Sequence, residues 1–359
     1  MFKITYFSPC DSVSGVGGSA RFSNMLDVLQ SLGYSTDTVI YRNRGADVPT
    51  LLKSVDVLSL IAEGLKRSRS SRVIFAHAPT IVSGFPALVA ALLLRKPLII
   101  DHMDKKDPIT PTRLFNLILR KATLVLTISQ ALESQVTALG GKAVYLPPFV
   151  DTEVFEPLPE ARERIRRNLG ISPEDTVIGY CGSFWHTEDL PLLLSIFSEL
   201  VQRYKVHLLV IGGDNTHEGK RLFDGLSPLA KSRLHLVGFV PYSQVPSYLS
   251  ACDIACAPKT DCEENRLASP IKVCEYMAMG LPVVASAIGG IKDTIRDGVD
   301  GLLVRPGNYG DLYYSLLSLV GLKDRQSRLG DAARMTAVAQ FSKAVVEHIV
   351  SEAVKEVAT

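Results

Sequence analysis

Short apolar runs alternate with segments of helical length along the whole chain. Alternation of this kind is typical of parallel, doubly wound sheets flanked by helices. In the first half the predicted strands are Lys3–Phe7, Thr36–Tyr41, Arg72–Ala76, Pro97–Asp101, Leu124–Ile128 and Ala143–Leu146. In the second half they are Val177–Cys181, Val206–Ile211, Leu234–Val237, Ile254–Ala257, Val283–Ala285 and Gly301–Val304. The same plan in both halves predicts an α/β fold with two such domains.

A proline-rich segment, Pro147 to Pro159, lies between the two halves. Clustered prolines favour an extended connection, so we expect a domain boundary there. The prediction is a first domain over residues 1–155, a second over residues 156–338 and a final segment over residues 339–359. The final segment contains a long amphipathic helix, Phe341 to Val357.

The composition fits two globular domains, because 47% of the 359 residues are hydrophobic and 21% are charged. A net charge of +2 gives no sign of nucleic-acid binding. The longest apolar run, Phe85 to Leu94, is too short to span a bilayer, and the first residues lack the apolar length of a signal peptide. The six cysteines match no zinc spacing, so we expect reduced thiols in the cytoplasm.

One stretch, Ser269 to Ser286, carries the strongest chemical signal. Its pattern predicts a helix over Pro270–Met279, with Ser269 as N-cap and Gly280 as a left-handed stop. The free amides of Ile271, Lys272 and Val273 would then form an anion site with the helix dipole and the lysine charge.

Glu275 lies roughly 9 Å along this helix from the cap. A phosphate on the amides and a sugar hydroxyl on the carboxylate would therefore suit a nucleoside diphosphate. The plainer interpretation is an ordinary capped helix with an exposed lysine and glutamate.

The segment SPIKVCEYMAMGLPVVAS, followed by Gly289-Gly290, resembles the donor-binding segment of retaining family-four glycosyltransferases (glycosyltransferase group 1 type), which have the GT-B fold. The resemblance implies two Rossmann-like domains facing across a cleft and a C-terminal helix that crosses back to the first domain. It implies that Glu275 binds the ribose of the sugar donor. The backbone that would hold the diphosphate is that of Ser269, Pro270, Ile271, Lys272 and Val273.

Two features of the first half also match the family. The glycine-rich segment after the first strand resembles a GGxxR loop, which implies that Gly17, Gly18 and Arg21 face the donor phosphate and the acceptor. His102 ends a strand where the family commonly has a histidine close to the transferred sugar, so we expect it to point into the cleft. The plainer interpretations are a flexible turn and a hydrogen-bonded surface histidine.

The pattern is broken after the strand Val177–Cys181. Gly182 and Ser183 belong to the donor site by the resemblance, but Ser183 stands where the family usually has an arginine. Counting without a gap puts Glu188 at the family's lysine, where a negative charge would repel a diphosphate. With a short gap, Trp185-His186 matches a variant of the family, and His186 could supply the missing hydrogen-bond donor. A second family glutamate is replaced by Leu267.

The leading hypothesis is a retaining, metal-independent glycosyltransferase that moves a sugar from a nucleotide-diphosphate-sugar to a glycan, lipid or small-molecule acceptor. Its catalytic residues would be His102, Lys272 and His186, with no metal site and no cofactor, since the nucleotide-sugar is a substrate. One alternative is a catalytically inactive GT-B-like partner of another transferase. The other is a GT-B nucleotide-sugar epimerase, which would need no acceptor.

Basic residues cluster in Lys66–Arg72 and Lys105–Lys121, and the second cluster includes several apolar residues. A helix with mixed basic and apolar residues could rest on an anionic membrane. The commoner explanation is a helix with one solvated and one core face. The expected location is the cytoplasm, with contact to the inner face of the membrane left open.

Overall fold

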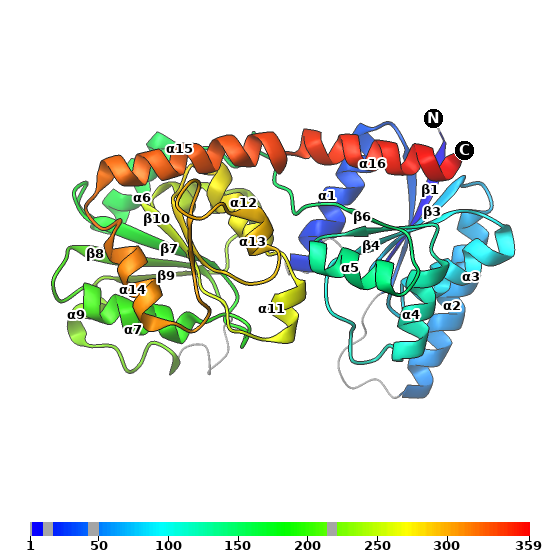
Figure 1. Ribbon diagram of the computed structural model, residues 1–359, viewed down its shortest axis with the longest axis horizontal. Coiled ribbons are helices and arrows are strands. Elements are labelled where there is room, and N and C mark those ends of the chain that lie inside the picture. The colour runs from blue at the N-terminus through cyan, green and yellow to red at the C-terminus, as the bar shows by residue number, and fades with distance from the viewer. Residues whose placement is uncertain (1, 10–16, 42–49, 214–220) are drawn as a thin grey trace. The chain divides into compact units, whose positions relative to one another are not determined.

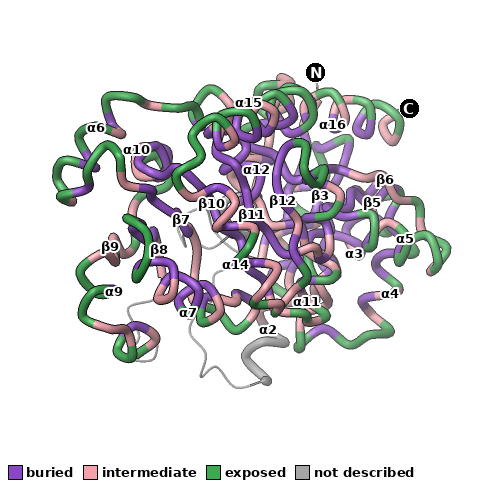
Figure 2. Tube along the Cα trace, turned by 60° about the vertical axis from the view of Figure 1, so that its left-hand side comes forward, coloured by how far each residue is buried: buried purple, intermediate pink, exposed green. Residues whose placement is uncertain are grey.

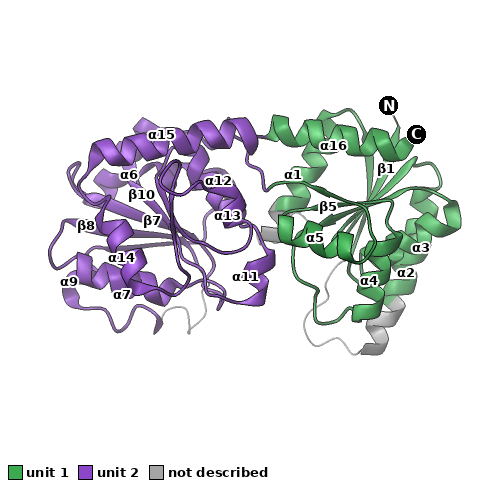
Figure 3. Cartoon of the chain, viewed as in Figure 1, with its two compact units in different colours: residues 1–147, 343–359 green, residues 148–342 purple. Residues whose placement is uncertain are grey.

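The structure is a computed structural model that describes residues 2–9, 17–41, 50–213 and 221–359 (Figure 1). The side chains of residues 17–20 and 50–55 lie outside the description. The chain forms two compact units (Figure 3). Unit 1 comprises residues 1–147 and 343–359, and unit 2 comprises residues 148–342. The predicted boundaries were residues 155 and 339.

Unit 1 is built on a six-stranded sheet with the strand order β2-β1-β3-β4-β5-β6, and each neighbouring pair is parallel. Its strands are β1 (Lys3–Ser8), β2 (Ser35–Ile40), β3 (Val73–His77), β4 (Leu98–His102), β5 (Leu124–Thr127) and β6 (Ala143–Tyr145). Its helices are α1 (Gly17–Ser31), α2 (Thr50–Ser68), α3 (Gly84–Leu94), α4 (Thr112–Lys121), α5 (Gln130–Ala138) and α16 (Lys343–Ala358).

Unit 2 repeats the plan with the strand order β12-β11-β10-β7-β8-β9, again parallel throughout. Its strands are β7 (Thr176–Gly182), β8 (Val206–Gly212), β9 (Leu234–Gly238), β10 (Ile254–Ala257), β11 (Val283–Ser286) and β12 (Leu302–Val304). Its helices are α6 (Pro159–Asn168), α7 (Leu190–Leu200), α9 (Pro228–Ser232), η1 (Tyr242–Gln244), α10 (Val245–Ser250), α11 (Glu263–Leu267), α12 (Ile271–Ala278), α13 (Ile291–Thr294), α14 (Tyr309–Leu317) and α15 (Lys323–Gln340).

The two-sheet α/β prediction is confirmed, and each predicted strand is present with its ends shifted by at most one residue. The apolar runs are explained by burial on both sheet faces. On β7, Val177 contacts the core that includes α12 and α15, whereas Ile178 contacts the core that includes α7 and α14. Strands β10 and β11 are buried along their whole lengths (Figure 2).

The strand order of unit 2 reverses between β7 and β10, because the chain continues from β7 to β8 on one side and reaches β10 on the other. Ligands of doubly wound sheets bind at the carboxyl ends of strands beside such a switch point. Gly182 ends β7 there, and Lys259 follows β10.

The last helix, α16, belongs to unit 1 and packs on α1 and β3. It buries Val346, Val350 and Val354. Glu347 accepts a hydrogen bond from Ser31 of α1, with an Oγ–Oε1 distance of 2.5 Å. Among the described helices, none combines the length and the apolar character that crossing a bilayer would require.

Candidate functional site

Helix α12 starts one residue later than the sequence predicted. Pro270, not Ser269, occupies the N-cap position, and no side chain caps the helix. Ser269 is buried, and its Oγ has no hydrogen-bond partner among the described residues. The amide of Val273 donates to the Pro270 carbonyl at 3.2 Å. The predicted serine cap is therefore wrong, because Ser269 is turned toward the loop that follows β11.

Glycines set both ends of this helix. Gly280 has φ +66°, so the predicted left-handed stop is confirmed. Gly289 has φ +51°, and a Cβ there would lie 2.1 Å from the Asn265 carbonyl oxygen. A Cβ on Gly290 would lie 2.5 Å from Ser269 Oγ. The glycine pair therefore lets the β11 loop pass directly against the segment that starts α12.

Lys272 lies in the first turn of α12, and its ammonium group reaches the end of β7. Its Nζ is 4.9 Å from the centre of the Tyr180 ring, a cation–π contact. Gly182 has φ +152°, and a Cβ there would lie 2.4 Å from the same Nζ. Glycine at residue 182 thus leaves the space that the ammonium group occupies.

Glu188 is buried and accepts hydrogen bonds from two lysines through the same oxygen, Oε1. Lys259 Nζ lies 2.6 Å from this oxygen, and Lys272 Nζ lies 2.9 Å from it. Burial would raise the pKa of Glu188, but the two ammonium groups outweigh it and hold this pKa below its usual range. Burial, together with repulsion from Lys272, lowers the pKa of Lys259.

Glu275 lies one turn after Lys272 and is also buried. Its Oε1 accepts a hydrogen bond of 2.9 Å from the hydroxyl of Tyr242, a residue that the sequence had not pointed to. Burial raises the pKa of Glu275 to about 7, against the opposing effects of Tyr242 and Lys272. This carboxyl group therefore titrates near neutral pH.

The loop after β7 contains Ser183 and Glu188, two residues that depart from the family pattern. The Ser183 carbonyl accepts a hydrogen bond of 2.5 Å from the Tyr180 hydroxyl. His186 is exposed, and its carbonyl accepts a hydrogen bond of 3.2 Å from Thr260 Oγ1. His186 and Glu188 line one cavity of about 510 Å³. Both candidates for the missing lysine therefore lie beside the same space, but only Glu188 contacts Lys272.

In unit 1, His102 ends β4 and is completely buried, whereas the sequence predicted an imidazole that points into a cleft. Its ring meets Phe115 edge-on, with 5.5 Å between the ring centres. In the part of the chain that the structure describes, neither ring nitrogen has a hydrogen-bond partner. Burial lowers the pKa of His102 to about 4, although Asp101 opposes the shift. The imidazole is therefore neutral at pH 7.

Arg21 has a different environment from the one that the sequence predicted. Its guanidinium group is buried and binds Asp101 through two hydrogen bonds, Nε to Oδ2 at 3.2 Å and Nη2 to Oδ1 at 3.0 Å. Its Nη1 also donates to the Pro147 carbonyl at 3.2 Å. Although burial opposes it, Arg21 and then His77 hold the pKa of Asp101 far below its usual range. The prediction that Arg21 faces a phosphate or an acceptor is corrected, because its charge is already used inside unit 1.

Gly17 and Gly18 form the first turn of α1, not an open loop. Gly15, at the start of the predicted glycine loop, lies outside the described residues.

Comparison with known proteins identifies unit 2. Residues 175–321 match the family model "Glycosyl transferases group 1". The second unit is a glycosyl transferases group 1 domain. It contains Lys272, Glu275 and Glu188, whereas Arg21 and His102 lie outside the matched residues.

Relatives of known function match part of the chain. A D-inositol 3-phosphate glycosyltransferase from Actinosynnema mirum is 29% identical over 196 residues, which cover 51% of this chain and 45% of the relative. A sulfoquinovosyl transferase from Arabidopsis thaliana is 28% identical over 284 residues, covering 73% and 52%. The chain therefore spans about half the length of these relatives.

Solved structures match the whole chain. HepE from Anabaena in complex with UDP and glucose aligns with a TM-score of 0.76 and 17% identity, over 99% of this chain and all of that one. Likeness at this identity shows the fold, so the predicted GT-B architecture of two Rossmann-like units is confirmed.

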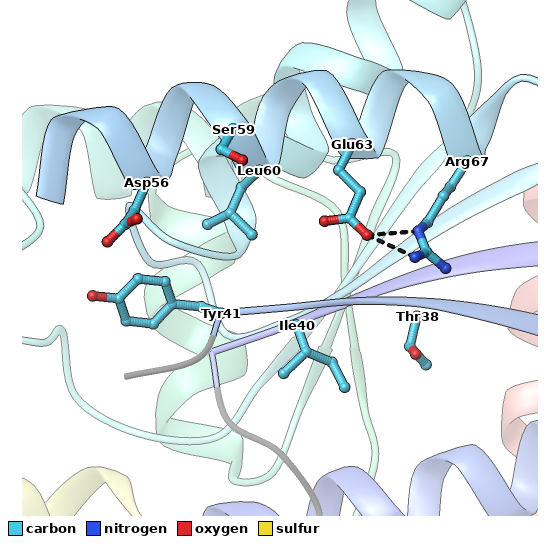
Figure 4. A pocket seen from close by; sticks show the side chains of 8 residues that line it. All are labelled: Thr38, Ile40, Tyr41, Asp56, Ser59, Leu60, Glu63 and Arg67. Carbon is cyan, nitrogen blue, oxygen red and sulfur yellow. Dashed lines mark hydrogen bonds and ion pairs between the residues drawn. The ribbon is translucent and has the colours of Figure 1, made fainter. Parts of the chain in front are cut away.

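Outside the glycosyl transferases group 1 domain, a second cavity of about 360 Å³ lies between β2 and α2 of unit 1. Figure 4 shows Glu63 of α2 bound to Arg67 on one side of it, and Asp56 and Tyr41 on the other. The sequence predicted no site there. Among the described residues, no group of three or more His, Cys, Asp or Glu side chains is placed to hold a metal ion.

Proposed function

We propose that the chain transfers a sugar from a nucleotide-diphosphate-sugar to an acceptor, with retention at the anomeric carbon. The observation that carries the proposal is the pairing of Lys272, at the start of α12, with a buried carboxyl group one turn later, inside a glycosyl transferases group 1 domain. A cation and a carboxylate at this spacing match the diphosphate and the ribose of a nucleoside diphosphate.

On this proposal the diphosphate binds the free amides of Ile271 and Lys272 and the lysine ammonium group. Glu275 accepts hydrogen bonds from ribose hydroxyls and exchanges its contact with Tyr242 for them. UDP in the HepE complex supports a nucleoside diphosphate as ligand. Positive charge fixed beside the diphosphate stabilises the negative charge that grows when the bond from the sugar to the phosphate oxygen breaks.

We assign the acceptor side to unit 1. His102 has two buried ring nitrogens without a described partner, and a neutral imidazole can accept one hydrogen bond and donate another. Two hydroxyl groups, from the sugar or the acceptor, would satisfy one nitrogen each. His102→Ala should therefore lower turnover more than it lowers affinity for the free nucleotide. Collapse of nucleotide affinity with unchanged turnover at saturation would contradict this assignment.

Transfer without a metal ion or cofactor follows from the same proposal. The lysine charge and the helix amides supply the positive potential that a divalent cation supplies in other transferases. Turnover that persists in excess chelator is the expected result.

An exposed basic face on helix α4 indicates the class of acceptor. Helix α4 packs Phe115, Ile118 and Leu119 into the core and exposes Arg113, Arg120 and Lys121 with Leu117. We propose that this basic face contacts an anionic membrane from the cytoplasmic side, as a lipid acceptor would require. Sedimentation with vesicles that contain an anionic lipid, but not with neutral vesicles, is the expected result.

A second candidate function is nucleotide-sugar binding without turnover. Glu188 favours it, because its carboxylate already neutralises part of the lysine charge in the site. Thermal shift with nucleotide-sugars of each base, followed by detection of released nucleoside diphosphate, separates the two candidates. Binding and release with a retained anomeric configuration support transfer, and binding alone supports the second candidate. If no compound binds, both are wrong.

A further inference from the structure

Two lysines and one carboxylate form a buried cluster at the switch point of unit 2. Lys259 and Lys272 both donate to Oε1 of Glu188, at 2.6 Å and 2.9 Å. The relative exposures of Lys259 and Glu188 are both 7%. Within the described residues, the ion pairs of these lysines are to Glu188 alone. The cluster therefore carries one positive charge in excess.

A purely structural link between the two loops would need one lysine. A second ammonium group on the same oxygen adds repulsion, and an unpaired charge taken out of water is costly. This cost is removed when an anion binds beside the two ammonium groups. The surplus charge thus distinguishes a binding site from a closed ion pair.

The backbone holds the cluster in place. Glu188 and Lys259 form an isolated antiparallel bridge. The Asp189 amide donates to the Pro258 carbonyl at 3.1 Å, and the Thr260 amide donates to the Thr187 carbonyl at 3.2 Å. These contacts join the loop after β7 to the loop after β10, next to the start of α12. Both lysines are therefore fixed at the carboxyl ends of the strands, where the sheet binds ligands.

We propose that Lys259 and Lys272 together bind a diphosphate group, and that Glu188 holds the two ammonium groups until the diphosphate arrives. The inference rests on the proposed function in one respect, because there the diphosphate belongs to the nucleotide-sugar. Lys259 then supplies the cation that is missing at Ser183 and at Glu188. The positive charge comes from the loop after β10, on the other side of the switch point.

Calorimetric titration with inorganic pyrophosphate and with UDP, at one ionic strength, tests the proposal. Lys259→Met removes the charge but keeps an unbranched side chain of similar length. Loss of a charge-assisted hydrogen bond should weaken binding about ten- to a hundredfold, as Lys272→Met should. Lys259→Arg should restore most of the affinity. Lys205→Met, at an exposed lysine of unit 2, is the matched control and should bind as the wild type does.

Glu188→Gln separates a binding site from a structural link. If the contacts only join two loops, Glu188→Gln and Lys259→Met break the same link and should weaken binding alike, which would overturn the proposal. If the lysines bind the diphosphate, Glu188→Gln no longer competes for them, so affinity should be retained or should rise several-fold. Thermal unfolding of each variant checks that it is folded.

The remaining outcomes also support or overturn the inference. Failure of the wild type to bind either pyrophosphate or UDP, or equal affinity of Lys259→Met and wild type, would overturn the inference. Pyrophosphate binding that depends on both lysines, without consumption of any nucleotide-sugar, would support the diphosphate site and overturn the proposed transfer.

Discussion

Each unit buries charged side chains near the carboxyl ends of its strands, but the two sets are balanced differently. In unit 1, Asp101 is matched by one guanidinium group in a two-bond arrangement. In unit 2, Glu188 is shared by two ammonium groups. The first set is complete and stabilises the fold around it. The second set has one positive charge in excess, which is what an anion site requires.

The buried carboxyl groups show the same contrast. Arg21 and His77 hold the pKa of Asp101 far below its usual range against burial. Glu275 has only the Tyr242 hydroxyl as a direct partner in the described structure, and burial raises its pKa to about 7. A carboxyl group that is buried without a cation costs stability, and such groups are concentrated at functional sites.

Breaking the Arg21–Asp101 pair should have the largest effect on stability. Arg21→Met leaves the Asp101 carboxylate buried without its cation, which should lower the free energy of unfolding by about 3–5 kcal/mol. Urea unfolding followed by circular dichroism measures the loss. Arg113→Met, at an exposed arginine of the same unit, should change stability by less than about 0.5 kcal/mol. Equal effects of the two variants would mean that the Arg21–Asp101 pair does not stabilise unit 1.

Removing the Glu275 carboxyl group should instead raise the free energy of unfolding. The pKa of Glu275 is raised from 4.5 to about 7 in the folded state. The folded protein therefore binds more protons between these values, and stability is lost as pH rises through about 7. At about 1.4 kcal/mol per pKa unit, Glu275→Gln should stabilise the fold by about 3 kcal/mol at pH 8 and by nothing below pH 4.

Unfolding curves at pH 8 and pH 4 test this prediction, with nucleotide affinity measured on the same samples. The variant should be more stable at pH 8 and should bind nucleotide more weakly. A variant that is no more stable at pH 8 would show that burial of Glu275 costs little.

Features set by residues close together in the sequence were predictable, and contacts between distant residues were not. The strands and α12 follow from local patterns of apolar residues and from Gly280. Lys259 and Glu188 are 71 residues apart, so no local pattern joins them, and Glu188 alone indicates repulsion. Tyr242 meets Glu275 across 33 residues. The Ser269 cap failed because the serine side chain packs against Gly290, which is also distant in sequence.

A histidine pair in unit 2 should cause a smaller loss of stability as the pH falls. His207 Nδ1 lies 2.9 Å from His235 Nε2, and His207 Nε2 lies 3.1 Å from Asp175 Oδ2. Burial lowers the pKa of His235 to about 4, with a further effect from His207. The unfolded chain then binds more protons below pH 6.5, so stability falls as pH falls.

His235→Gln should remove part of the loss between pH 7 and pH 5.5, less than about 1 kcal/mol, because solvent screens this half-buried group. This is opposite in sign to the Glu275 effect, so pH titration of both variants separates the two groups. An unchanged acid slope in His235→Gln would assign the loss to another group.

The smallest effect on stability is expected at His186, which is exposed and next to the lysine cluster. His186→Ala should change the free energy of unfolding by less than about 0.5 kcal/mol. If the imidazole binds a phosphate oxygen, turnover should fall well beyond that change. If turnover is unaffected, the missing cation is supplied by the lysines alone.

On the proposed function, the start of α12 binds the diphosphate of a nucleotide-sugar. Titration of wild type, Lys272→Met and Lys205→Met with nucleotide-sugars of each base measures this binding. At least one compound should bind the wild type and the Lys205→Met control equally, and Lys272→Met should bind it at least about tenfold more weakly. Binding of the same compound by Lys272→Met with wild-type affinity, or binding of none by the wild type, would contradict this proposal.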